Sequence, residues 1–182
     1  IGDFLEGVEI LLKKKGHLIL EVPDLNSLIE KVGFDTIYHE HRHYFSEKSI
    51  CKVLKKYNLF VYKIQKINYM SGSLRVFASN VNKFNNFKNP RKVTLNQFRS
   101  FKKKAFLTIK KVKDFLKKHK STIGVGAATK GNTLLNCCDV TDKELKFIVD
   151  KSKHKINKFT PGTGIKIIKE TRYINADSAL IL

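Results

Sequence analysis

One segment restricts the fold of this 182-residue chain more than any other, because an apolar strand pattern, a glycine-containing turn and a helix pattern follow one another without a break. The segment covers residues 123–133 and reads Ile-Gly-Val-Gly-Ala-Ala-Thr-Lys-Gly-Asn-Thr. A second apolar run, from Lys146 to Asp150, lies further along the chain. Strands that alternate with helices are typical of α/β sheets. Residues 121–182 are therefore predicted to form a small Rossmann-like α/β domain, with a further strand at 179–182.

The same turn has the features of a phosphate-binding site. Glycines let the backbone approach an anion, and a helix N-terminus supplies N–H groups and a partial positive charge. Thr129 stands where a third glycine is usual, Lys130 lies inside the turn, and Asp150 follows at about the spacing expected of a carboxylate that holds ribose hydroxyls. A tight turn without a ligand remains the alternative. Lys130 and Asp150 favour a nucleotide-type ligand.

Residues 1–81 show the pattern of another α/β region. Asp3 and Glu6 predict a helix N-cap box, and Gly16 is expected to end that helix. Ser46 is expected to cap a later helix. The order helix, strand, helix, helix, strand, strand is that of an α/β sheet whose opening strands are missing. The elements are predicted at His17 to Val22 (strand), Leu25 to Lys31 (helix), Leu59 to Ile67 (strand) and Ser73 to Asn80 (strand), with an inner helix face at Ile50, Val53, Leu54 and Tyr57.

A polar, asparagine-rich stretch from Asn82 to Pro90 predicts a linker. Apolar residues then recur at helical spacing over a long amphipathic helix whose lysines form a solvated face. The predicted organisation is thus residues 1–81 as the C-terminal part of one domain, 82–120 as linker and long helix, and 121–182 as the second α/β domain. The apolar positions of the long helix are Leu95, Phe98, Phe101, Ala105, Ile109, Val112 and Leu116.

Residues 38–46, Tyr-His-Glu-His-Arg-His-Tyr-Phe-Ser, gather titratable groups at one place. Three of the six histidines fall within five positions, next to a carboxylate and between two tyrosines. An imidazole near a carboxylate and a phenol can take up a proton near neutral pH and stabilise the resulting oxyanion. A solvated loop is the simpler interpretation. The density of titratable groups favours a catalytic role.

Composition excludes several classes of protein. The formal charge is +20, but only five of the basic residues are arginine. Arginine is the residue that most often recognises bases and makes bidentate hydrogen bonds to phosphates. A preference for anionic ligands is expected, and dedicated nucleic-acid binding is not. No apolar run of membrane-spanning length occurs. Three cysteines without a Cys-x-x-Cys pair argue against a disulfide framework and a zinc knuckle, so a reducing, cytoplasmic setting is expected, with Cys137 and Cys138 buried.

Several segments together resemble one family, the sugar C-methyltransferases, which use S-adenosylmethionine to methylate a carbon of a nucleotide-linked 4-keto-deoxysugar. The runs Tyr-His-Glu-His at 38–41 and Lys-Gly-Asn-Thr-Leu-Leu-Asn at 130–136 are the most specific. Met70-Ser71 depart from the family's usual His-Gly, and Gly164-Ile165-Lys166 depart from its His-Ile-Pro. The other matching segments are 3–7, 21–23, 34–37, 44–46, 72–76, 126–128, 149–150 and 161–163.

The resemblance implies a three-part protein with a zinc-binding N-terminal domain, a central methyltransferase domain with a Rossmann-like sheet, and a C-terminal domain for the nucleotide sugar. This chain would cover the end of the central domain and most of the last. Its zinc cysteines and the main S-adenosylmethionine loop would lie upstream, so no metal is expected here and the chain alone is expected to be inactive.

The resemblance also implies residue roles. His41 would be the base, Tyr38 the donor to the oxyanion and Glu40 the group that orients or polarises them. Two alternatives are a nicotinamide-dependent oxidoreductase, which leaves the histidine cluster idle, and a non-catalytic nucleotide-sugar-binding module. The sequence does not specify which sugar is used or the oligomeric state. The substrate-binding residues would be Lys130, Asn132, Thr133, Asp150 and Arg75.

Overall fold

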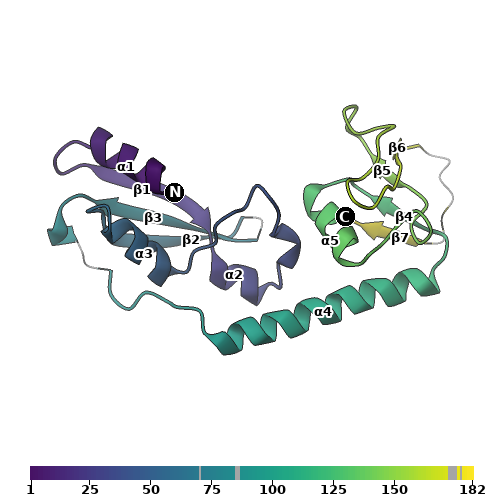
Figure 1. Ribbon diagram of the computed structural model, residues 1–182, viewed down its shortest axis with the longest axis horizontal. Coiled ribbons are helices and arrows are strands. Elements are labelled where there is room, and N and C mark those ends of the chain that lie inside the picture. The colour runs from purple at the N-terminus through teal and green to yellow at the C-terminus, as the bar shows by residue number, and fades with distance from the viewer. Residues whose placement is uncertain (70, 85–86, 172–175, 177) are drawn as a thin grey trace. The chain divides into compact units, whose positions relative to one another are not determined.

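The structure is a computed structural model that describes residues 1–69, 71–84, 87–171, 176 and 178–182. Met70, where the sequence departs from the usual histidine of the family it resembles, lies outside the described residues, as does Arg172. Two compact units make up the chain, one formed by Ile1–Phe34 and His39–Phe101, the other by Asp35–Tyr38 and Lys102–Leu182. One unit contains an antiparallel sheet and the other a parallel sheet (Figure 1). The predicted α/β fold class is confirmed.

The first unit is a three-stranded sheet covered by short helices. Its strands are β1 (His17–Pro23), β2 (Phe60–Ile67) and β3 (Ser73–Ser79), paired antiparallel in the order β1-β3-β2. The helices are α1 (Gly2–Leu11), α2 (Leu25–Glu30) and α3 (Glu47–Lys55), with a short 3₁₀ turn η2 (Asn82–Phe84). A second 3₁₀ turn, η1 (Phe34–Thr36), begins at the last residue before the chain enters the second unit. The core joins α1, α3 and one sheet face through Leu5, Val22, Phe45, Ile50, Leu54, Leu59, Val61, Leu74, Val76 and Ala78.

Of the two predicted helix N-caps, one is confirmed and the other is wrong. Ser46 is confirmed as the N-cap of α3, since its Oγ accepts the Ser49 N–H at 3.1 Å while Ser49 Oγ accepts the Ser46 N–H at 2.9 Å. The predicted Asp3 cap is wrong, because α1 already begins at Gly2 and has no side-chain cap. Asp3 instead lies in the first turn, where a carboxylate favours the positive end of the helix dipole. The helix also ends at Leu11, before Gly16.

The long helix α4 (Leu95–Lys118) confirms the predicted amphipathic helix. Thr94 and Gln97 exchange hydrogen bonds at its start, with Thr94 N–H to Gln97 Oε1 at 2.9 Å and Gln97 N–H to Thr94 Oγ1 at 3.3 Å. Of the apolar positions, Ala105 and Leu116 are buried. Within the described ranges, no helix combines the length and apolar character that a membrane crossing requires.

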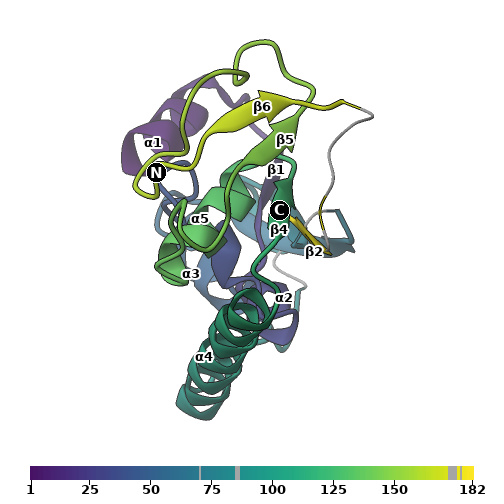
Figure 2. The ribbon, with the colours of Figure 1, turned by 90° about the vertical axis from the view of Figure 1, so that its right-hand side faces the viewer.

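The second unit is a parallel sheet with strand order β6-β5-β4-β7 (Figure 2). Its elements are β4 (Thr122–Val125), α5 (Thr129–Cys137), β5 (Ile148–Asp150), β6 (Ile167–Lys169) and β7 (Ser178–Ile181). Parallel strands need crossover connections, and α5 provides one between β4 and β5. The core consists of Leu116, Leu135, Cys138, Val140, Leu145, Ile148 and Ile165.

The two adjacent cysteines differ in exposure. Cys138 is buried as expected, and burial raises the pKa of its thiol to about 11. Cys137 is exposed, so that part of the expectation is wrong. The two residues end α5 on different sides of the helix, and only one side faces the core.

Candidate functional site

The turn between β4 and α5 has the backbone geometry of an anion site. Gly126 takes a φ of +86°, a left-handed conformation that favours glycine. Ala128 is the N-cap of α5 and makes no side-chain cap hydrogen bond. The first helical bond runs from Asn132 N–H to the Ala128 carbonyl at 2.9 Å. The N–H groups of the first turn, residues 129–131, therefore have no partner inside their own helix and can meet a negative charge.

Asp150, at the end of β5, fixes this turn. One carboxylate oxygen accepts the Ala127 N–H at 2.7 Å, and the other accepts the Ser152 N–H at 2.7 Å. The Ser152 hydrogen bond is the largest cause that lowers the pKa of Asp150 below its ordinary value, with Ala127 and Lys155 acting in the same direction against burial. Each oxygen retains a second lone pair. Asp150 thus holds the turn and keeps the capacity to accept a ribose hydroxyl.

Lys155 completes the support of the turn. Its Nζ donates to the Ala127 carbonyl at 2.8 Å and lies 3.8 Å from Asp150 Oδ2. Sequence reasoning missed Lys155, since a lysine among many gives no pattern of its own. The two side chains hold both the N–H and the carbonyl of Ala127, so the turn before α5 is fixed from two sides.

The three other residues predicted to bind substrate in this unit lie together on the first turns of α5. Lys130 is 43% exposed and its Nζ is 3.4 Å from an Asp35 carboxylate oxygen. The Asn132 side-chain carbonyl is buried and has no hydrogen-bond partner among the described residues. Thr133 donates its hydroxyl to the Thr129 carbonyl at 3.1 Å, within the helix. The Asn132 side-chain oxygen can thus accept a hydrogen bond from a ligand, whereas the Thr133 hydroxyl proton is already used in a hydrogen bond within the helix.

A second loop is attached to the same helix. Asn136 Nδ2 donates to the Pro161 carbonyl at 3.1 Å and to the Asn132 carbonyl at 2.8 Å. Gly162 has a φ of +78°, and a Cβ there would overlap the Asn136 amide. The sequence placed both segments in the resemblance but assigned Asn136 no role. Its role in the structure is to hold the loop at 161–163 against α5.

The histidine cluster lies on a loop between η1 and α3 whose far end is fixed. Phe45 is buried and joins the chain at the end of β1, with its N–H donating to the Pro23 carbonyl and its carbonyl accepting the Leu25 N–H, each at 3.0 Å. His41 is half-buried, and its ring lies 6.3 Å from that of Tyr44. His43 stacks on Phe45 at 6.1 Å.

The three residues predicted for catalysis do not all fall in one unit. Glu40 is exposed and belongs, with His41, to the first unit. Tyr38 is half-buried and belongs to the second unit. Their assignment as donor, orienting group and base stays a prediction. Among the residues that the structure describes, no group of three or more histidine, cysteine, aspartate or glutamate side chains could hold a metal ion.

Arg75 lies on β3, directly opposite Glu21 on β1. Its Nη2 and Nε donate to Glu21 Oε2 at 2.9 and 3.2 Å, while Ser73 Oγ donates to Oε1 at 2.6 Å. These hydrogen bonds, first from Ser73 and then from Arg75, lower the pKa of Glu21. An anionic substrate group that approached Arg75 would compete with Glu21. Substrate binding by Arg75 also stays a prediction.

Comparison with known proteins gives the family. A family model described as the C-methyltransferase C-terminal domain matches residues 70–182, which include α5 and the turn before it. The C-methyltransferase NovU of Streptomyces niveus is 32% identical over 182 residues, which cover 92% of this chain and 43% of that relative. The chain therefore spans less than half the length of this curated relative. Because the family model matches more than half of the residues, the predicted membership is confirmed, and the chain belongs to the family of the C-methyltransferase C-terminal domain.

Proposed function

We propose that this chain is part of an enzyme that transfers a methyl group from S-adenosylmethionine to the carbon next to the keto group of a nucleotide-linked 4-keto-deoxysugar. The observation that supports it most is the match of a C-methyltransferase family model across the residues that build the uncapped N-terminus of α5. The family match supports the reaction class, and the uncapped helix N-terminus supports an anionic ligand.

The second unit would hold the nucleotide. The diphosphate lies against the first-turn N–H groups of α5 and the Lys130 ammonium, where the helix dipole and a cation act together. The buried Asn132 carbonyl accepts a hydrogen bond from the nucleoside. Thr133 contributes its hydroxyl oxygen, Asp150 accepts from the ribose, and Arg75 in the first unit contacts the substrate through its guanidinium.

The histidine loop would perform the proton chemistry. His41 removes a proton from the carbon next to the ketone, and the electron pair moves onto the carbonyl oxygen. The Tyr38 hydroxyl donates to this oxyanion, and Glu40 orients the imidazole. S-adenosylmethionine, when bound, supplies the electrophilic methyl group that the carbon then accepts. No residue of this chain is assigned to that cofactor.

An oxidoreductase would use the same turn and Asp150, but the family match favours methyl transfer. The experiment that separates them uses the full-length protein, a nucleotide-linked 4-keto-deoxysugar and S-adenosylmethionine with a labelled methyl group. Transfer of the label to a sugar carbon is expected. Reduction of the ketone at the expense of a nicotinamide cofactor, without label transfer, would contradict the proposal. Binding of the sugar without either reaction would identify a non-catalytic module.

A further inference from the structure

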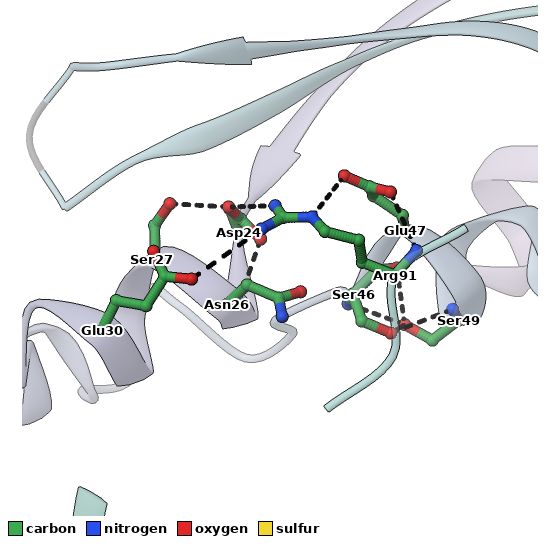
Figure 3. Close-up of polar contacts among 8 residues, drawn as sticks. All are labelled: Asp24, Asn26, Ser27, Glu30, Ser46, Glu47, Ser49 and Arg91. Atoms are coloured by element: carbon green, nitrogen blue, oxygen red, sulfur yellow. Dashed lines mark hydrogen bonds and ion pairs between the residues drawn. The ribbon is translucent and has the colours of Figure 1, made fainter. Parts of the chain in front are cut away.

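Arg91, in the segment between η2 and α4, is attached to the first turn of α3 by its backbone and its side chain (Figure 3). Its N–H donates to Glu47 Oε2 and its Nε to Glu47 Oε1, both at 2.9 Å. Its carbonyl accepts the Lys48 N–H at 3.0 Å. The linker thus supplies a cap for a first-turn N–H group of α3 that the helix itself cannot satisfy.

The Arg91 guanidinium continues from α3 to α2. Nη2 lies 3.8 Å from Asp24 Oδ2, and Nη1 lies 3.8 Å from Glu30 Oε1. Asp24 is the N-cap of α2, where it accepts the Asn26 N–H at 3.0 Å and the Ser27 hydroxyl at 2.6 Å. One cation therefore faces carboxylates from two helices, and Figure 3 shows the guanidinium between them.

The burial of these groups makes Arg91 hard to replace. The Asp24 side chain is fully buried and that of Glu47 is 9% exposed, whereas that of Arg91 is 34% exposed. Buried carboxylates are stable as anions only when a cation or hydrogen-bond donors compensate them. Nη2 of Arg91 is itself buried without a hydrogen-bond partner among the described residues, and it lies 3.8 Å from Asp24 Oδ2. A lysine could not span this arrangement with several donors.

The two helices that Arg91 joins flank the segment that contains the histidine loop. The chain leaves α2 after Glu30, passes through η1 and the histidine loop, and returns at Phe45 and Ser46, the N-cap of α3. Asp24 itself pairs with Phe45 in a parallel bridge. Arg91 therefore contacts the chain on both sides of the point where the loop closes. His41 lies within this loop, four residues before Phe45.

We propose that Arg91 is a positioning residue for the base. It fixes the distance between the N-termini of α2 and α3, and so it holds the end of the loop that carries His41. It touches no substrate, and this inference rests on the proposed role of His41. General-base catalysis is sensitive to placement, because a shift of about 1 Å costs about 10²-fold in rate. Loss of Arg91 should lower the rate of proton removal without changing how the nucleotide sugar is held.

The test compares Arg91→Met with Arg99→Met in the full-length enzyme. Arg99 lies in α4, where its Nη1 donates to Asn96 Oδ1 at 3.5 Å, and it makes no ion pair with a carboxylate among the described residues. For Arg91→Met, kcat for methyl transfer is expected to fall about 10–100-fold while KM for the nucleotide sugar stays within about twofold. Backbone amide exchange should become faster in a peptide over residues 39–46 and stay unchanged over β2 and β3. Arg99→Met should match the wild type in all three measurements.

A second variant covers the case in which Arg91→Met does not fold. Arg91→Lys keeps the positive charge but loses the planar guanidinium with its separate N–H donors. It is therefore expected to fold and to show an intermediate kcat with unchanged KM. Folded Arg91→Met or Arg91→Lys enzyme with wild-type kcat and wild-type amide exchange would overturn the proposal. Measuring the activity of His41→Ala in parallel distinguishes a wrong role for Arg91 from a wrong role for His41. If His41→Ala keeps full activity, it is the role of His41 that is wrong, and a positioning role for Arg91 toward that base falls with it.

Discussion

Lys130 stands in the first turn of α5, where a bound diphosphate would meet both its ammonium and the helix N–H groups. In the full-length enzyme, Lys130→Ala should weaken nucleotide-sugar binding by about 1.5–3 kcal/mol, the range for a hydrogen bond to a charged group. Isothermal titration calorimetry measures this change, with Lys117→Ala on the exposed face of α4 as the control. Affinity for S-adenosylmethionine should not change. Equal nucleotide-sugar affinities for both variants would favour a turn that binds no ligand.

Asp150 predicts a pH dependence of stability. Its pKa is lowered in the folded state, chiefly by the Ser152 N–H. The folded state therefore binds this proton less readily than the unfolded state, so the contribution is complete above the ordinary pKa and is lost as the pH falls through the lower, folded value. Asp150→Asn should reduce the free energy of unfolding by about 1–3 kcal/mol at neutral pH.

Chemical denaturation at several pH values tests the Asp150 prediction. The difference between wild type and Asp150→Asn should shrink as the solution becomes strongly acidic. Asp142→Asn is a suitable control because Asp142 is exposed. A difference that is constant from neutral to acidic pH would show that the Asp150 carboxylate does not hold the turn in its charged form.

At the scale of residues, sequence reasoning worked where the signal is local. Ser46 was found because an N-cap serine interacts with the helix that follows it. Lys130 and Asp150 were predicted to bind the ligand from the spacing of a known turn pattern, and that role stays a prediction. The hydrogen bonds of Asp150 to the turn were not foreseen. Arg91 could not be found, because its three carboxylates come from residues 44 to 67 positions earlier in the chain. No local pattern contains such contacts.

At the scale of elements, the close packing of α5 on the end of β7 depends on a glycine. A Cβ at Gly131 would overlap Leu182, including its backbone. Gly131→Ala should therefore destabilise the protein by about 1–3 kcal/mol, the usual cost of overpacking. Gly7→Ala is the matched control in α1, where an added Cβ meets no atom within 4 Å. It should be stabilising by about 0.5–1 kcal/mol because alanine favours the helix.

Thermal unfolding of the two alanine variants measures this pair of effects. The midpoint should fall for Gly131→Ala and rise slightly for Gly7→Ala. If both variants shifted in the same upward direction, helix propensity would dominate at both glycines, and the contact between α5 and the chain end would not constrain residue 131.

Element positions were predictable because their hydrophobic periods are strong, as in α4, or because glycine and proline bound them, as at β1. The pairing of the strands was less accessible. The sequence predicted remnants of an α/β sheet in residues 1–81, with two successive strands at β2 and β3, but did not indicate that β3 also pairs antiparallel with β1. Strand order depends on contacts between distant residues, such as Leu20 with Val76, which no local pattern specifies.

At the scale of the whole molecule, the two units correspond to different parts of the proposed reaction. The first contains the loop with His41. It also contains the ion pairs of Arg91 with Asp24 and Glu47, which are proposed to position that loop. The second contains the turn before α5, which is proposed to hold the nucleotide. The family match supports methyl transfer as the reaction, and the chain spans 43% of its relative's length. The role of His41 as the base is therefore best tested in the full-length enzyme.

Exchange of the acidic sugar C–H proton with deuterated solvent, followed by NMR without the methyl donor, reports the role of His41 by itself, because this exchange needs a base and no electrophile. Wild type and His43→Ala are expected to exchange this proton, His41→Ala is not, and Tyr38→Phe is expected to exchange it more slowly. In the complete reaction, His41→Ala should lower kcat by about 10²–10⁴. Wild-type exchange in His41→Ala, together with loss in His39→Ala or His43→Ala, would contradict the assignment of the base.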